Sequence, residues 1–183
     1  MPSILRALRL APVAAVALLA ACATPKATPP VVAIPDALRA PADERLLRTL
    51  DASGVQIYEC RAKGLDAGAA EWVLVAPEAQ LFDANGLRVG KHYAGPTWES
   101  DDGSKIVGAV KAKADAPEAG AIQWLLLATH STGGAGAFAN VTSVQRIATS
   151  GGSAPSTGCG ATTIGQQVRV PYKAQYTQYV KKG

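Results

Sequence analysis

Hydrophobic positions in most of the chain recur every second residue, in runs separated by turn residues, and this period predicts β-strands. The runs are 55–60, 71–76, 79–89, 106–113, 122–129, 141–149 and 168–181. Because 79–89 contains a turn signal, we expect about eight or nine short strands. Strands without intervening helices are typical of an antiparallel β-sandwich or barrel, and we predict this all-β fold.

Two dipeptides, Asn85-Gly86 and Asp102-Gly103, are strong signals for two-residue hairpin turns. Centring a two-residue turn on the first places Asp83 opposite Arg88, an oppositely charged cross-strand pair. The second turn would pair Ser100 with Lys105, Glu99 with Ile106 and Trp98 with Val107.

Two of the later runs, 122–129 and 168–181, differ in how they alternate. Residues 122–129 (IQWLLLAT) are apolar on both faces, which predicts the most buried strand. Residues 168–181 alternate, with Tyr172 and Tyr176 among the inward positions and Lys173 among the outward ones. Pro171 cannot donate a backbone hydrogen bond, so this strand should lie at an edge or bulge there.

One short helix is expected near the N-terminus, over residues 42–53 (ADERLLRTLDAS). Asp43 can cap it, and Leu46, Leu47 and Leu50 would share a face. A single helix of this length cannot organise a helical fold, so it does not change the all-β prediction.

The N-terminal residues 1–21 have the features of a secretory signal: Arg6 and Arg9 precede an apolar run too short to span a bilayer. The run ends in Leu19-Ala20-Ala21-Cys22, which resembles a bacterial lipobox and implies that Cys22 is lipidated. The alternative is ordinary cleavage, with Cys22 as a free thiol. The next residue is Ala23 and not Asp, which by resemblance to the sorting rules of Gram-negative lipoproteins predicts the outer membrane.

This interpretation divides the chain into three parts. After the signal peptide, residues 22–41 form the lipidated cysteine and a proline-rich tether, and residues 42–183 form one β domain. The membrane is then a partner through the N-terminal lipid. Cys60 and Cys159 form an even pair in an oxidising compartment, which predicts a structural disulfide.

The sequence does not supply the residues that several classes of function require. The last 65 residues hold five basic and no acidic side chains, too sparse for a nucleic-acid surface. The chain has only two histidines, His92 and His130, and their spacing is not one that metal ligands use, so no metal is expected. Residues 134–139 (GAGAFA) fit the outline of a dinucleotide turn, but a β-prone segment follows and no acidic residue does. We therefore expect no cofactor.

Five stretches together resemble a known family: 54–60 (GVQIYEC), 90–104 (GKHYAGPTWESDDGS), 122–129, 144–159 (VQRIATSGGSAPSTGC) and 169–180 (RVPYKAQYTQYV). In this order they are similar to the secreted bacterial and fungal family filed as domain of unknown function 3455. The resemblance covers nearly all of residues 42–180. It implies one extracytoplasmic domain and no catalytic residues.

The segment His92–Ser104 concentrates aromatic and ionisable side chains, and its candidate ligand-binding residues are His92, Tyr93, Trp98 and Glu99. Tyr93 and Trp98 could stack on a sugar ring. Our leading hypothesis is an envelope lipoprotein that binds a ligand without catalysis, with a polysaccharide or other envelope component as partner. The first alternative is a polysaccharide hydrolase using Glu99 and His92 as an acid–base pair. The second is a purely structural envelope protein.

Overall fold

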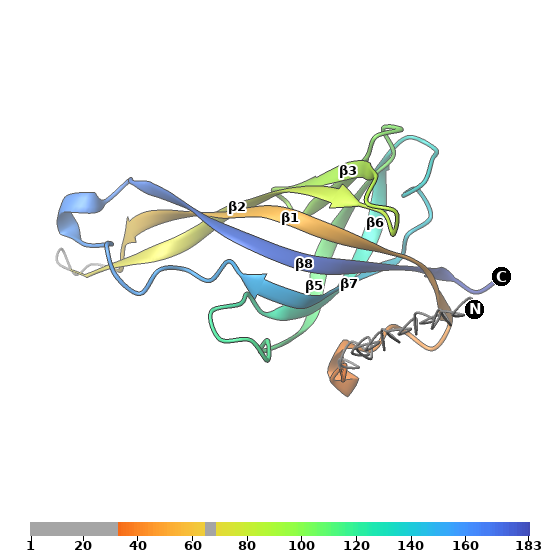
Figure 1. Cartoon of the computed structure of the whole chain (residues 1–183), viewed down its shortest axis with the longest axis horizontal. Coiled ribbons are helices and arrows are strands. Elements are labelled where there is room, and N and C mark those ends of the chain that lie inside the picture. The colour runs from red at the N-terminus through yellow and green to blue at the C-terminus, as the bar shows by residue number, and fades with distance from the viewer. Residues whose placement is uncertain (1–32, 65–68) are drawn as a thin grey trace, which may run out of the picture. The chain divides into compact units, whose positions relative to one another are not determined.

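The computed structural model describes residues 33–64 and 69–183, which form a closed barrel of eight antiparallel strands (Figure 1). Each strand pairs with the next along the chain, and the last pairs with the first. The strands are β1 (Glu44–Ala62), β2 (Ala70–Phe82), β3 (Arg88–Tyr93), β4 (Thr97–Ser100), β5 (Lys105–Ala114), β6 (Trp124–Gly133), β7 (Ser143–Gly151) and β8 (Gln167–Lys181), with 3-10 turns η1 (Asp36–Leu38) and η2 (Ala161–Thr163). The all-β antiparallel prediction is confirmed, in its barrel form.

The strands differ greatly in length, which makes the barrel wall uneven. β1, β2 and β8 have 19, 13 and 15 residues, whereas β3 and β4 have six and four, so the expectation of short strands is wrong for β1 and β2, and the predicted long run 168–181 corresponds to β8. β3 pairs with β2 only over Ala79–Phe82. The earlier part of β2 pairs with β1 alone among the described strands. In Figure 1 the long strands run well past the others.

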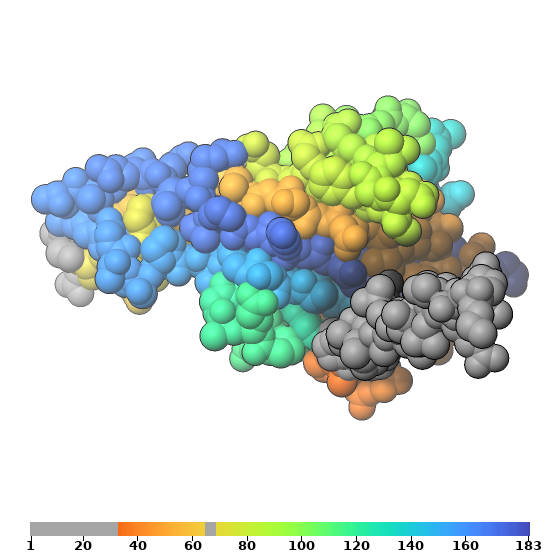
Figure 2. All heavy atoms as spheres, viewed as in Figure 1, coloured from red at the N-terminus to blue at the C-terminus, as the bar shows by residue number. Residues whose placement is uncertain are grey.

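The predicted disulfide closes this extension. Cys60, near the end of β1, is bonded to Cys159 in the loop before β8, with 5.3 Å between their Cα atoms. The Trp72 indole donates a 2.9 Å hydrogen bond to the carbonyl of Thr157 in the same loop. Figure 2 shows this loop and the start of β8 packed over β2, so the loop forms part of the extension's surface.

Alternation along β8 fills the barrel interior as predicted. Tyr172, Ala174 and Tyr176 are buried in the main core, and Lys173 is exposed. Pairing of β8 with β7 ends at Tyr172, so Pro171 lies just beyond the β7–β8 ladder and pairs only with Val55 of β1. On its β7 side Pro171 is therefore at an edge, as predicted. The core residues are Leu50, Ala52, Ala79, Leu81, Trp98, Ile106, Ile122, Leu127, Phe138, Val141, Val144, Tyr172, Ala174 and Tyr176.

The outer face of β6 is buried in the first half of the strand, which explains the two apolar faces there, whereas the second half is half-buried or exposed, so the prediction that this is the most buried strand is wrong. Trp124 and Leu126 pack with Ile147 and with Leu38 of η1, which is 0% exposed. Gln145 donates a hydrogen bond to the Leu38 carbonyl. The compact unit therefore begins before Ala42, because part of the predicted tether belongs to the domain. The predicted signal peptide and Cys22 lie outside the described residues.

The helix predicted over residues 42–53 is wrong. Residues from Glu44 onward belong to β1, which pairs with β8 from Glu44–Lys181 to Glu59–Gln167. A bulge at Leu47, which has no partner in β8, interrupts the two-residue period. Within the described residues, no helix has the length and apolar character needed to cross a membrane.

Both predicted hairpins form, and both are shifted by one residue. Phe82 pairs with Arg88 in the first, and Trp98 pairs with Ile106 in the second. Each turn has three residues instead of two and ends in a glycine, Gly86 (φ 77°) or Gly103 (φ 87°). This is the three-residue hairpin loop with a left-handed third position. Arg88 consequently bonds Asp101 at 2.9 Å and not Asp83.

Candidate functional site

Strand alternation divides the four predicted site residues between the two faces of the barrel wall. His92 of β3 pairs with Trp98 of β4, and both side chains are buried inside, at 2% and 1% exposure. Tyr93 and Glu99 follow them in sequence and therefore point to the outer face. His92 and Glu99 do not meet, so the geometry gives no support to an acid–base pair.

The inner pair forms an aromatic stack with β8. The His92 ring lies 4.5 Å from the Trp98 ring at 18°, and both contact the Tyr176 ring, at 4.9 and 5.4 Å. The Tyr176 hydroxyl lies 3.2 Å from that of Tyr172. These rings occupy the centre of the barrel and give the cavity described below a rigid wall.

His92 is held in one neutral form. Its Nδ1 lies 2.8 Å from the Thr97 carbonyl, which can only accept, so Nδ1 carries the proton. Burial lowers the pKa of His92 to about 3, because the charged ring would lose its hydration. The ring therefore presents an unprotonated Nε2 at neutral pH.

The outer pair is a surface ion cluster. The Tyr93 hydroxyl donates a 2.6 Å hydrogen bond to Glu99, whose carboxylate also contacts Lys105 at 3.2 Å and Lys91 at 3.4 Å. The Tyr93 and Lys105 hydrogen bonds lower the pKa of Glu99 to about 2. The Lys91 ammonium lies 5.6 Å from the Tyr93 ring centre, so a cation already contacts one face of that ring.

A cavity of about 300 Å³ opens into the barrel beside the His92–Trp98 stack. It lies where the part of β2 that pairs only with β1 faces the turn between β3 and β4, because those strands are too short to cover it. We call it the barrel cavity, and its lining residues are Gln56, Leu74, Val75, Ala76, Pro77, His92, Gly95, Pro96, Trp98, Val110, Leu125, Leu127, Arg146 and Tyr176.

The lining is an apolar wall with a few polar groups, the composition of a small-molecule site. Leu74, Val75 and Val110 are 50%, 41% and 54% exposed and form an apolar rim. Inside are Gln56, buried at 1% exposure, and the partly buried Arg146. No Asp or Glu is among the described residues that line it, so it lacks the two carboxylates of a glycosidase.

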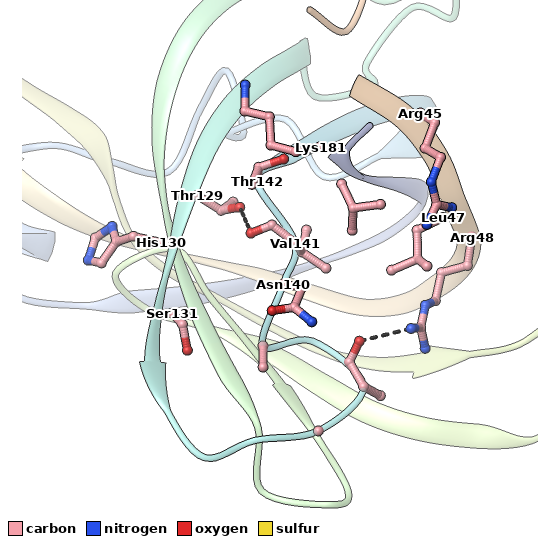
Figure 3. Close-up of a pocket in the computed structure, with 14 residues that line it drawn as sticks. Arg45, Leu47, Arg48, Thr129, His130, Ser131, Asn140, Val141, Thr142 and Lys181 are labelled. Atoms are coloured by element: carbon pink, nitrogen blue, oxygen red, sulfur yellow. Dashed lines mark hydrogen bonds between the residues drawn. The ribbon is translucent and has the colours of Figure 1, made fainter. Parts of the chain in front are cut away.

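A second hollow of about 740 Å³ lies at the other ends of β1, β6 and β8 (Figure 3). Arg48 donates to the Ala137 carbonyl at 2.8 Å, and Lys181 contacts Asp43 at 2.8 Å. Figure 3 shows the His130 ring pointing away from the two arginines, Arg45 and Arg48. This hollow is larger and more open, and most of its lining residues are polar or charged, whereas small-molecule sites are usually lined by apolar residues. The barrel cavity is the stronger candidate.

The family model for DUF3455, described as a protein of unknown function, matches residues 41–180. The match runs from just before β1 to the penultimate residue of β8. The chain belongs to this family. The resemblance noted from the sequence is confirmed, and it supplies no reaction. Comparison with curated proteins and with solved structures finds no match.

The described part of this DUF3455 chain contains no group of three or more His, Cys, Asp or Glu side chains placed to hold a metal ion. The carboxylate of Asp102, a further polar group of the predicted stretch, is engaged in structure. It accepts hydrogen bonds from Ser104 N at 2.9 Å, Ser104 Oγ at 2.6 Å and Ala137 N at 2.7 Å. These bonds tie the β4–β5 turn to the β6–β7 loop and lower the pKa of Asp102.

Sequence reasoning missed two polar members of the cavity in this DUF3455 chain, Gln56 and Arg146. Both occupy inward positions of strands, between outward neighbours, where an apolar residue is usual. A polar side chain at an inward strand position was therefore the available signal. It could be recognised only once the inward face of β1 and β7 was known.

Proposed function

We propose that this protein is a non-enzymatic binding protein that takes one small, largely apolar molecule into the barrel cavity. The observation that carries the proposal is the cavity itself, with an exposed apolar rim that leads to buried polar groups. Eight-stranded barrels are just wide enough either to fill with side chains or to hold one small ligand. Here part of the interior is filled by rings and part is open.

The position of the aromatic side chains favours an enclosed ligand over a polysaccharide on the surface. Trp98 is 1% exposed and can offer no face to an external sugar chain. The Tyr93 hydroxyl donates a hydrogen bond to Glu99, and the Lys91 ammonium lies over one face of its ring. A small molecule inside the barrel would instead contact the accessible lining residues Leu74 and Val110.

A binding experiment with 1-octanol, a neutral apolar probe, tests this function. In calorimetric titrations we expect the full chain to bind one equivalent, and Val110→Trp to weaken binding at least tenfold by filling the cavity mouth. Leu87→Trp is the matched control, since Leu87 is 66% exposed and lies outside the cavity. No binding, or equal loss in both variants, would contradict the proposal and leave a purely structural role.

We also propose that the protein acts in the cell envelope, anchored by a lipid on Cys22, in the outer membrane of a Gram-negative bacterium. The lipobox-like Leu19–Cys22 and the apolar run before it support this location. The Cys60–Cys159 disulfide is of the kind that persists in oxidising compartments. Mass spectrometry of protein from its native membrane should find a lipid-modified Cys22 as first residue; an intact Met1 would contradict the anchor.

A further inference from the structure

Arg146 places a positive charge on the inner side of the barrel. It lies on β7 two residues after the fully buried Val144, and therefore on the same face of the strand. It lines the barrel cavity and also an adjoining hollow of about 250 Å³, together with Gln56 and Leu74. Its Nε and Nη2 donate to the Gln123 carbonyl at 3.0 and 2.8 Å, which fixes the guanidinium.

The charge of Arg146 has no counter-charge within the described residues. Among residues 33–64 and 69–183, no Asp or Glu lines either hollow and no ion pair includes Arg146. After burial, which is the largest cause, repulsion from Arg146 helps to keep the pKa of His92 low. A partly buried guanidinium is normally balanced by an anion, because removing a charge from water is costly.

Other groups of the cavity wall are also donors in excess. Buried polar atoms without a hydrogen-bond partner occur at five described side chains, and two of these line the cavity: Gln56, through Nε2, and Trp98, through Nε1. Both atoms are N–H donors. These two atoms have almost no accessible surface, so the Arg146 guanidinium, which also interacts with the Tyr176 hydroxyl, is the donor group that a ligand in the cavity can reach.

We propose that the ligand of the barrel cavity is a small amphipathic carboxylate whose carboxylate group pairs with Arg146. The inference rests on the proposed function and specifies its ligand. A single guanidinium balances one negative charge, and its planar fork matches a carboxylate. The apolar body lies against Leu125, Leu127 and the Val110 rim. At about 30 Å³ for each water-sized group, the cavity holds roughly ten non-hydrogen atoms, the size of octanoate.

The test compares octanoate with 1-octanol on the full chain by calorimetry. We expect octanoate to bind about ten- to a hundredfold more tightly, because a hydrogen bond to a charged group contributes about 1.5–3 kcal/mol. Arg146→Gln should abolish this preference, so that octanoate and 1-octanol bind this variant with similar affinity. Arg146→Lys, which keeps the charge without the fork, should retain part of it. Arg45→Gln, at the other end of the barrel, is the matched control and should behave as wild type.

The outcomes separate the two proposals. Equal affinity for both probes, or a preference for octanoate that survives in Arg146→Gln, would overturn the carboxylate assignment and leave the cavity as a binding site. Failure of both probes to bind the wild-type chain would overturn the function itself. Circular dichroism and urea unfolding of each variant show whether it folds, and Arg146→Lys keeps the test decisive if Arg146→Gln does not.

Discussion

The imidazole of His92 lies flat against the indole of Trp98, with 4.5 Å between ring centres and 18° between planes. The two residues face each other across the β3–β4 ladder, and the stack is enclosed by the barrel. Each side chain thereby fixes the other's orientation at the wall of the cavity. A charged imidazole would be unfavourable there.

This arrangement predicts a loss of stability in acid. The pKa of His92 is about 3 in the folded chain and about 6.5 when unfolded, so only the unfolded state takes up this proton between those values. The contribution is fully present above pH 6.5 and falls by at most about 1.4 kcal/mol per pH unit as the pH decreases toward 3. Urea unfolding from pH 7 to 4 should show a flatter profile for His92→Gln. The exposed His130→Gln is the control, and identical slopes in all three proteins would contradict the account.

On the outer face, Tyr93→Phe should raise the pKa of Glu99. The Tyr93 hydroxyl is the largest cause of its low value, and without it the pKa should move from about 2 toward 4.5. Stability that depends on ionised Glu99 is present above pH 4.5 and lost as the pH falls toward 2. A carboxyl carbon NMR titration measures the shift. The titration curve of Glu59, whose carboxylate accepts a hydrogen bond from Arg61, is the internal control and should be the same in the wild type and in Tyr93→Phe.

Gly108 makes room for the cavity wall, and Gly108→Ala should destabilise the barrel by about 1–3 kcal/mol. An added Cβ would lie 2.9 Å from Cζ3 of Trp98 and 3.1 Å from Cδ2 of Leu127. Gly133→Ala, at another strand glycine, would place its nearest contact at 3.7 Å and should change little. Urea unfolding measures the free energy of unfolding of both variants. Equal losses in the two would show that Gly108 is not sterically required.

The disulfide should be a major contribution to stability. It closes a loop of 99 residues, for which the chain-entropy model gives about 4–5 kcal/mol. The double variant Cys60→Ala/Cys159→Ala should lose roughly this amount in urea unfolding, and wild type with a reducing agent should behave alike. A reducing agent should leave the double variant unchanged. Unaltered unfolding of the reduced wild type would contradict a structural role.

The two hairpins show which parts of the fold local sequence can determine. Asn85-Gly86 and Asp102-Gly103 correctly locate the turns, because a left-handed position needs glycine. The same glycine also suits the third position of a three-residue loop, so the dipeptide does not determine the register. Here Asp83 accepts hydrogen bonds from the backbone N–H groups of Asn85 and Leu87, which stabilises the longer loop.

The N-terminal half of β1 could not be assigned locally. Leu46, Leu47 and Leu50 fit a helical face, and the bulge at Leu47 hides the strand period. Pairing with β8, more than a hundred residues away in sequence, decides the conformation there. The placement of the four site residues on two opposite faces, by contrast, could have been predicted from the sequence. Once His92-Tyr93 and Trp98-Glu99 are assigned to strands, alternation alone sends their members to opposite faces.

The cavity is the part that sequence could not predict, since its position depends on where β3 and β4 end relative to β2. Its use as a binding site is tested most directly by the indole N–H resonances of the three tryptophans. Among these, only Trp98 lines the cavity. Titration of the full chain with octanoate should shift the Trp98 resonance and leave those of Trp72 and Trp124 in place. No shift at Trp98, or equal shifts at all three, would contradict a ligand inside the barrel.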